Sequence, residues 1–404
     1  MAAPEGESRR EQADAQMTQG EQRVTPLELF FDLVFVYAVT QVTTLMARDP
    51  TWAGIGRGLL MLAASWWAWT GYAWLTNVLE PEDHLVRAGM FAAMTAMLVA
   101  ALAIPGAFGP VAVLFGVAYL LVRLINVGLF AIAGRHDPDF RRALHRFAPT
   151  ALTGSILIFA AGFFDGGARI ALWLVAILAL YSGLLIAGMR GWHIPPAHFA
   201  ERYGLVVIIA LGESIVAIRF ATAGTELAPG VIAAACLGLA VVAALWWAYF
   251  DVFALLAEHQ LAMSARLTRA HLARDYYAYL HLPMIAGVVL FALGLELAVH
   301  DVMKPLAVVP AVALCGGLSL YFFTHVAMRG RLVYLIRRTT SERPRWISPG
   351  RLATAIATMA SIPLARTLSA LGALALVALL CWALIVWDVV HYRDLRLEVR
   401  ASRR

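Results

Sequence analysis

The stretch TPLELFFDLVFVYAVTQVTTLMA at residues 25–47 sets the class of this protein. Glu28 and Asp32 are its only charged residues, and most of the others are apolar. A helix rises 1.5 Å per residue, so about 20 apolar residues cross a hydrocarbon core of about 30 Å. A helix is expected because a backbone in contact with lipid must satisfy its hydrogen bonds within its own segment. The stretch therefore predicts a transmembrane helix.

Apolar stretches of similar length follow one another along the rest of the chain. The predicted spans are 26–47, 54–78, 84–104, 110–134, 144–164, 168–189, 199–221, 229–254, 274–299, 306–328, 349–365 and 367–390. We therefore expect an all-α integral membrane protein with about twelve transmembrane helices.

The composition supports the same class. Hydrophobic residues make up 61% of the 404 residues and charged residues 14%, with a mean hydropathy of +0.74. Soluble domains carry about a quarter charged residues, so an ordinary soluble protein is excluded. The net charge of +6 is spread over loops and ends and does not indicate nucleic-acid binding. The three cysteines fall inside predicted spans, where small packing residues are expected rather than disulfides or metal ligands.

The basic residues predict the orientation. They concentrate in the two ends of the chain and in the loops that share a side with those ends. Basic loops stay in the cytoplasm, so both termini are expected there. Residues 1–24 are polar and read as a disordered cytoplasmic tail rather than a signal peptide. Residues 392–404 read as a basic cytoplasmic tail.

The sequence also matches itself at a long interval. WWAW at 66–69 matches WWAY at 246–249, HLVR at 84–87 matches HLAR at 271–274, Glu28 matches Glu201, and Tyr119 and Arg123 match Tyr321 and His325. The order of the matches predicts a tandem six-plus-six repeat, with copies at 25–190 and 191–391. Six is an even number, so the two copies enter the membrane in the same direction. Any site is then expected between the halves.

Several segments resemble one known family. They are TPLELFFDLVFV at 25–36, ERYG at 201–204, IIALGES at 208–214, WWAYFD at 246–251 and YLHLP at 279–283. In these segments the chain resembles the bacterial low temperature requirement protein A family, over about residues 23 to 390. The resemblance implies a membrane protein linked to growth in the cold. It implies no particular substrate or reaction.

Charged residues within the spans are the first candidates for a site. Each costs about 2.5–3.5 kcal/mol at the helix centre and usually faces the bundle interior or a wet cavity. Glu28 and Asp32 are four residues apart, so they share one helical face. Glu213 is the deepest acid and stands beside Ser214. Arg123 lies near the middle of its span, and a pair between Glu213 and Arg123 would offset the burial of both.

Four further residues extend this set. Gln41 adds a polar group to the first span, and Asp251, His281 and His325 lie in the inner half of later spans. Histidine titrates near neutral pH and so suits a proton relay. Structural roles stay open as alternatives. The acids could cap helices or pair with arginines, and the histidines could be hydrogen-bonded packing residues.

These features predict a secondary transporter or ion channel of the bacterial cytoplasmic membrane, with its pathway between the halves. The buried acids and the histidine favour proton coupling. No nucleotide-binding or common hydrolase motif occurs in the sequence. The alternatives are a membrane-embedded enzyme acting on lipid or isoprenoid substrates and a non-catalytic membrane scaffold. The expected partners are the lipid bilayer and a small solute or ion, without nucleic acid or a cofactor. A homo-oligomer is compatible with the sequence.

Overall fold

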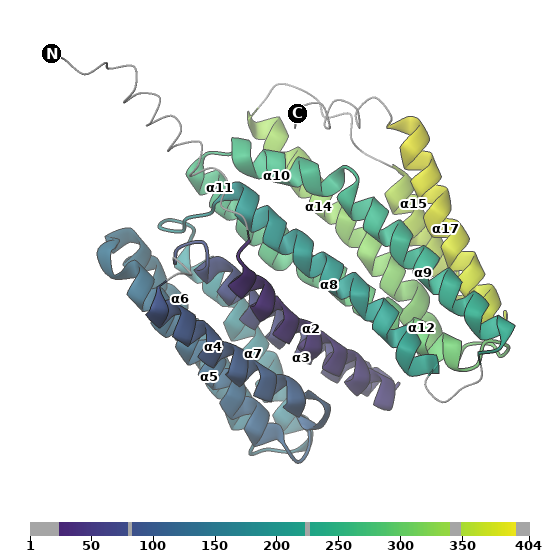
Figure 1. The fold of residues 1–404 in the computed structure, drawn as a ribbon, viewed down its shortest axis with the longest axis horizontal. Coiled ribbons are helices and arrows are strands. Elements are labelled where there is room, and N and C mark those ends of the chain that lie inside the picture. Colours follow the sequence, from purple (N-terminus) through teal and green to yellow (C-terminus); the bar gives the residue numbers. More distant parts are fainter. Residues whose placement is uncertain (1–23, 80–82, 223–226, 340–348, 393–404) are drawn as a thin grey trace.

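The computed structural model describes residues 24–79, 83–222, 227–339 and 349–392, and these are almost entirely helical. Two groups of helices lie side by side (Figure 1). The first group contains α2 (Pro26–Arg48), α3 (Trp52–Leu75), α4 (His84–Ala103), α5 (Ala112–Ala133), α6 (Pro138–Ala161) and α7 (Gly166–Ala187). The second contains α8 (Pro196–Thr222), α9 (Pro229–Phe250), α10 (Phe253–Met263), α11 (Arg266–Leu272), η3 (Ala273–Tyr279), α12 (His281–His300), α13 (Val308–Ala311), η4 (Val312–Gly316), α14 (Gly317–Thr339), α15 (Pro349–Ala360), α16 (Ile362–Ala365) and α17 (Ala370–His391).

Helix α2 begins at a capping box. The hydroxyl oxygen of Thr25 accepts a hydrogen bond from the backbone N–H of Glu28, and the Glu28 carboxylate accepts one from the backbone N–H of Thr25. Pro26 occupies the first turn, where a missing N–H leaves no intrahelical bond unmade. The capping role considered for Glu28 is therefore confirmed.

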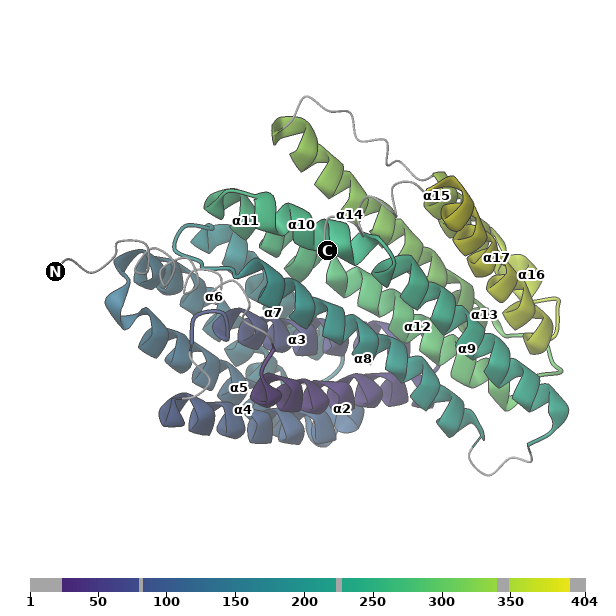
Figure 2. The same ribbon diagram turned by 45° about the horizontal axis from the view of Figure 1, so that its top comes forward.

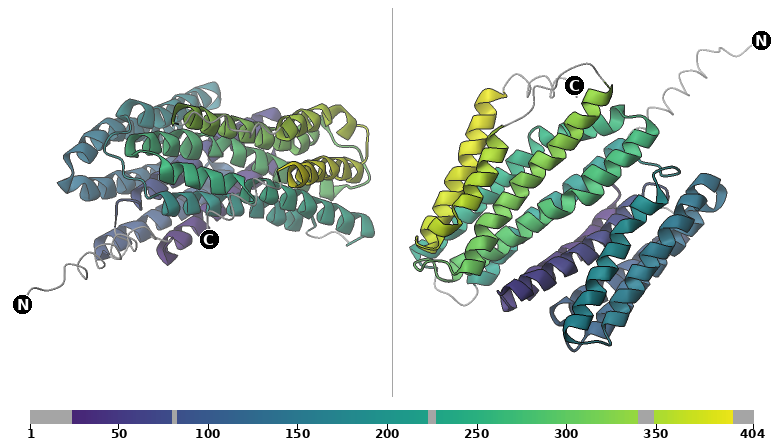
Figure 3. Two further views of the ribbon diagram at one scale, coloured as in Figure 1. Left: turned by 90° about the horizontal axis from the view of Figure 1, so that it is seen from above. Right: turned by 180° about the vertical axis from the view of Figure 1, so that it is seen from behind.

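Helix α2 lies at the boundary between the two groups. It packs against α3 and α4 of the first group and against α8 and α12 of the second, as Figures 1 and 3 show. Glu28 contacts Arg202 near the start of both α2 and α8, and Thr40 contacts Glu213 about three turns further along both helices. The two helices therefore run parallel, in the same direction.

The helices have the lengths and surfaces of membrane spans. Large apolar side chains such as Leu178 on α7 and Leu379 on α17 are exposed on the outside of the bundle. In the part of the chain that the structure describes, nine helices are long and apolar enough to cross a membrane: Pro26–Arg48, His84–Gly106, Ala112–His136, Gly166–Ala187, Pro196–Thr222, Pro229–Met263, Arg266–His300, Val308–Leu335 and Ala370–His391. The protein is therefore a multi-pass helical membrane protein.

Three of the twelve predicted spans are not among these nine, so the predicted number is not confirmed. Helix α3 corresponds to 54–78 and is rich in tryptophan, but most of its residues are buried between other helices rather than exposed to lipid. Helix α6 corresponds to 144–164 and carries basic residues in its first half. The segment 349–365 forms α15 and α16, which meet at Ser361. The 12 residues of α15 are too few to cross the membrane.

Two π-helical segments interrupt the second group. The first, η3, leads directly into α12, and the N–H of Leu280 bonds to the carbonyl of Asp275 five residues earlier. The second, η4, leads into α14. Such turns frequently occur at functional sites. Figure 2 shows α14 beside α12, and α15 to α17 on the side away from the first group.

Helices α12 and α14 approach closely at two glycines, which yields a prediction. A Cβ atom at Gly287 would lie 2.6 Å from the carbonyl oxygen of Gly317 and 2.8 Å from the backbone nitrogen of Tyr321. Gly287→Ala should therefore destabilise the protein by about 1–3 kcal/mol, because backbone atoms must move apart. Unfolding in mixed micelles measures this change.

The control for this prediction is Gly128→Ala on α5, where a Cβ atom would meet nothing within 4 Å. Alanine favours a helix over glycine, so this change should be neutral or stabilising. Equal stability of the two variants would contradict the tight crossing.

Candidate functional site

Polar side chains gather where α2 meets α8 and α12, between the two groups of helices. We call this set the polar seam. It consists of Glu28, Asp32 and Thr40 on α2, Arg202 and Glu213 on α8, and His281 and Glu296 on α12. Four of the nine predicted site residues, Glu28, Asp32, Glu213 and His281, lie in it.

Arg202 forms the centre of one end of the seam. Its Nη1 lies 2.9 Å from Glu28 Oε1, and its Nη2 lies 2.8 Å from Asp32 Oδ1. The indole Nε1 of Trp69 donates to the same Asp32 oxygen at 2.8 Å, and Arg202 also donates to the hydroxyl of Thr76. All three charged side chains are at most 2% exposed. One guanidinium thus joins α2, α3 and α8.

His198 is a second hydrogen-bonding partner of Glu28. Its Nε2 lies 3.1 Å from Glu28 Oε2, and its Nδ1 lies 3.0 Å from Asn77 Oδ1. The Asn77 amide nitrogen donates to the carbonyl of Ala73, so its oxygen faces the ring. A carboxylate and an amide oxygen both accept, and a ring that carries protons on both nitrogens satisfies both. With His198 in this form, two cations match the two acids.

Glu213 has a different environment further along the seam. It is 3% exposed, and the hydroxyl of Thr40 donates to its Oε2 at 2.7 Å. No arginine, lysine or histidine forms an ion pair with Glu213 among the described residues. Glu296 on α12 is a half-buried acid, so it offers Glu213 no positive partner. Ser214, the neighbour of Glu213, is buried, and its hydroxyl makes no hydrogen bond.

His281 lies at the start of α12, directly after η3. Its Nε2 is 2.8 Å from the hydroxyl of Tyr249, and its Nδ1 is 3.0 Å from the carbonyl of Tyr276. Its ring stacks on Tyr277, with centroids 5.3 Å apart, and contacts Tyr203, the residue after Arg202. His281 is therefore a hydrogen-bonded residue near the Arg202 end of the seam.

Three other predicted residues are outside the set defined as the polar seam. His325 is buried among aromatic rings, with Tyr321 at 4.4 Å and Phe253 at 4.8 Å between centroids, and neither ring nitrogen makes a hydrogen bond. Asp251 follows the end of α9 and lines a separate cavity. Gln41 is half-buried on α2, next to Thr40.

The predicted pair between Arg123 and Glu213 does not form. Arg123 is fully buried inside the first group, where its Nη1 donates to the carbonyl of Trp67 and its guanidinium lies over the ring of Phe147. Glu213 is held by Thr40 at the boundary of the groups. Both residues are in the middle of spans, but depth alone does not place two helices side by side.

Sequence reasoning missed the partners of the predicted acids. Arg202 and His198 were not predicted as site residues, although they stand at the start of an apolar span. The signal was the match of Glu28 with Glu201, which places Arg202 at the level of the acids on α2. A cation at that level in a parallel helix is the natural partner for Glu28 and Asp32.

Comparisons with known proteins identify a family model and a relative of this chain. The family model described as "Bacterial low temperature requirement A protein (LtrA)" matches residues 23–386. An uncharacterized protein of Rhizobium meliloti (strain 1021) is 31% identical over 286 residues, which cover 66% of this chain and 67% of the relative. No solved structure matches the chain.

The Arg202 end of the seam predicts a large effect on stability. Arg202→Gln leaves Glu28 and Asp32 buried without their shared cation, which should cost about 3–5 kcal/mol. Adding Glu28→Gln and Asp32→Asn to this variant should recover part of the loss, because no buried charge is then unmatched. Unfolding by SDS in mixed micelles, followed by tryptophan fluorescence, measures both changes.

Arg57→Gln is the matched control for Arg202→Gln. Arg57 pairs with Asp49 at 2.8 Å, but both side chains are more than a third exposed. Its loss should cost no more than about 1 kcal/mol. If Arg202→Gln cost as little as Arg57→Gln, the Arg202 pairs would not stabilise the fold.

Proposed function

Because the chain belongs to the bacterial low temperature requirement A family and is a multi-pass helical membrane protein, we propose that it is a secondary transporter or ion channel. Its pathway follows the polar seam between the two groups of helices. The environment of Glu213 carries this proposal. A buried acid without a basic partner is a place where a proton or a cation binds.

The physical argument starts from the cost of the charge. A carboxylate in the hydrocarbon region needs a proton, a cation or a fixed positive group. The Thr40 hydroxyl supplies one hydrogen bond to Glu213, which orients the carboxylate but adds no positive charge. Glu296 adds a second acid rather than a base. Two nearby acids do not both ionise readily, so this end of the seam favours uptake of a proton or a cation.

The Arg202 end of the seam has a complementary role in this proposal. There Arg202 pairs with Glu28 and Asp32, and His198 contacts Glu28. These side chains are packed closely together. An ion does not pass such a set without separation of α2 from α8. The pairs therefore close one end of the pathway in this conformation. Transport by alternating access would open them while the Glu213 end closes.

We also propose that the two groups are the six-helix copies expected from the sequence. The parallel course of α2 and α8 supports this relation. The hydroxyl of Tyr119 donates to the carbonyl of Ala64, and the hydroxyl of Tyr321 donates to that of Leu245. In both groups a tyrosine thus fastens the helix with the tryptophan motif. Both termini are placed in the cytoplasm, and the protein in the bacterial inner membrane, as part of this proposal.

A membrane scaffold is the second candidate function. The paired charges around Arg202 favour it, because internally matched charges need no ligand. Glu213 is the residue that separates the two candidates, since a scaffold gains nothing from a buried acid without a base.

The proposal predicts flux in proteoliposomes. Protein reconstituted into sealed vesicles with an enclosed pH-sensitive dye should move protons under a proton or potassium gradient. Glu213→Gln should lower the flux at least about tenfold, because proton or cation binding requires an ionisable carboxylate. Thr40→Val should lower it less, because this change removes only a hydrogen bond.

Asp139→Asn is the control for the flux measurement. Asp139 is an exposed acid on α6 that pairs with Arg142, and its side chain is 65% exposed. It should leave the flux unchanged. Wild-type flux in Glu213→Gln would exclude the Glu213 pathway. No flux from the wild-type protein under either gradient would contradict an ion pathway and favour the scaffold.

A further inference from the structure

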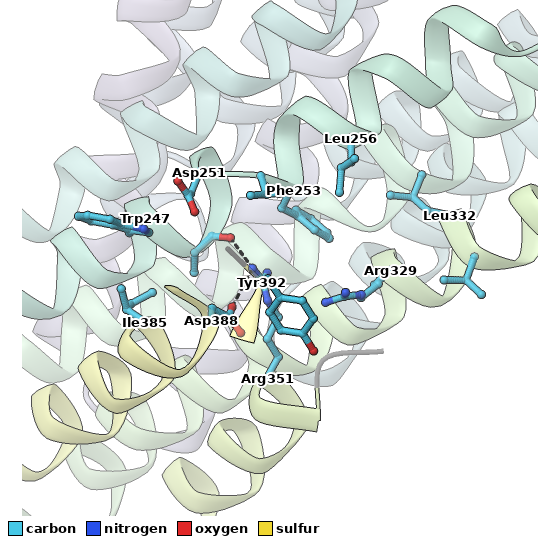
Figure 4. Close-up of a pocket in the computed structure, with 13 residues that line it drawn as sticks. Trp247, Asp251, Phe253, Leu256, Arg329, Leu332, Arg351, Ile385, Asp388 and Tyr392 are labelled. Carbon is cyan, nitrogen blue, oxygen red and sulfur yellow. Dashed lines mark hydrogen bonds and ion pairs between the residues drawn. The ribbon is translucent and has the colours of Figure 1, made fainter. Parts of the chain in front are cut away.

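A second polar site lies outside the seam, within the second group of helices. It is a cavity between the α9–α10 junction, α14, α15 and α17 (Figure 4). Arg329 on α14 and Arg351 on α15 both point into it, beside Tyr392 at the end of α17. We call it the arginine pocket.

The hydrogen-bonding capacity left over in the arginine pocket consists of donors. Arg351 is 7% exposed, and its Nη2 donates to the carbonyl of Ala248, but its Nε and Nη1 make no hydrogen bond within the part of the chain that the structure describes. The Nε of Arg329 and the indole Nε1 of Trp247 are also buried without an acceptor. Buried donors without acceptors are costly. A ligand rich in acceptor oxygens would satisfy all of them.

The two acids of the arginine pocket do not fill this need. Asp388 Oδ2 lies 3.5 Å from Arg351 Nη2, a long distance for an ion pair, and Asp388 has further contacts. Asp251 also has a partner of its own. The guanidinium groups rest instead on aromatic faces, with Arg351 over Phe253 at 5.2 Å and Arg329 over Tyr392 at 5.9 Å. Their polar edges remain available to a ligand.

The size of the arginine pocket limits the ligand. Its volume is about 60 Å³, the volume of about two water molecules in the liquid. A phosphate group, with one central atom and four oxygens, is of this size. Guanidinium groups bind phosphate through charge-assisted, two-pronged hydrogen bonds.

The first group contains a similar cavity that is too small for such a ligand. Trp67, the counterpart of Trp247 in the tryptophan motif, lines it together with Phe147 and Trp192, and its volume is about 10 Å³. Its walls are mostly aromatic. The corresponding place in the second group has Arg351 and Asp388 in its wall. The indole N–H groups of Trp67 and Trp74 in the first-group cavity also lack acceptors among the described residues, but the cavity of the second group has more room beside its donors.

We propose that the arginine pocket binds a phosphate group, carried either by a lipid headgroup or by a soluble molecule. Arg351 and Arg329 grip its oxygens from two sides, and the indole N–H of Trp247 donates a further hydrogen bond. The site is separate from the Glu213 pathway. Phosphate binding can therefore be tested whether or not the protein transports ions.

Calorimetric titration of the full-length, delipidated protein in detergent tests the proposal. The probes are dihexanoyl phosphatidic acid, inorganic phosphate, and dihexanoyl phosphatidylcholine, whose phosphate is covered by choline. Phosphatidic acid or phosphate should bind saturably, and Arg329→Gln and Arg351→Gln should each weaken binding at least about tenfold. Trp247→Phe removes only the indole N–H and should weaken it several-fold. Tighter binding of the lipid than of phosphate identifies a headgroup, and equal binding identifies a soluble source.

Arg142→Gln, on the exposed surface of α6, controls for the loss of one positive charge and should bind as the wild type does. If Arg351→Gln does not fold, Arg329→Gln and Trp247→Phe decide the matter. The proposal is overturned if the wild-type protein binds neither phosphate nor phosphatidic acid. It is also overturned if those two variants bind as tightly as the wild type. Equal binding of phosphatidylcholine and phosphatidic acid that the two variants leave unchanged would show binding through the acyl chains, and this result also overturns the proposal.

Discussion

The structure depends on the two ion pairs of Arg202. One buried guanidinium binds Glu28 and Asp32, and it thereby fixes α8 of the second group against α2 and α3 of the first. In lipid, apolar side chains give little preference for protein over solvent, so packing and polar contacts decide which helices associate. A charged pair has few alternative partners there. The Arg202 ion pairs therefore hold α2 between the two groups. They also align α2 with the parallel helix α8, so that Thr40 lies opposite Glu213.

The same constraint separates two kinds of buried charge. Around Arg202 the acids and bases are equal in number when His198 carries a second proton, and each is within hydrogen-bond distance of an opposite charge. Around Glu213 the hydrogen bonds from described residues come from hydroxyl groups. A matched set stabilises one conformation, whereas an unmatched acid changes its state when a proton or cation arrives. A structural role therefore fits the first, and an exchange of ions fits the second.

The sequence predicts the class of fold because a membrane leaves a chain few choices. Apolar stretches of sufficient length must be helices. In the described residues, nine helices are long and apolar enough to cross a membrane. The predicted number of spans is not confirmed at α3, whose apolar residues are buried against other helices rather than exposed to lipid. It is also not confirmed at α15, which is too short to cross the membrane. Three acids of the seam, Glu28, Asp32 and Glu213, were found from their places within the spans, whereas Glu296 was not predicted. Their partners were missed because pairing depends on which helices are neighbours, and Arg123 shows that depth does not give this information.

The two tryptophan motifs, at 66–69 and 246–249, line cavities that differ in size and in the residues of their walls. In the first group, Trp67 faces a closed space walled by Phe147 and Trp192. In the second, Trp247 lines a larger cavity that Arg351 of α15 also lines. Aromatic side chains fill space and satisfy few hydrogen bonds, so they seal a cavity. Arginine brings several donors that a helical bundle cannot easily satisfy from within. A cavity with arginines in its wall therefore offers more hydrogen-bond donors than one walled mainly by aromatic side chains.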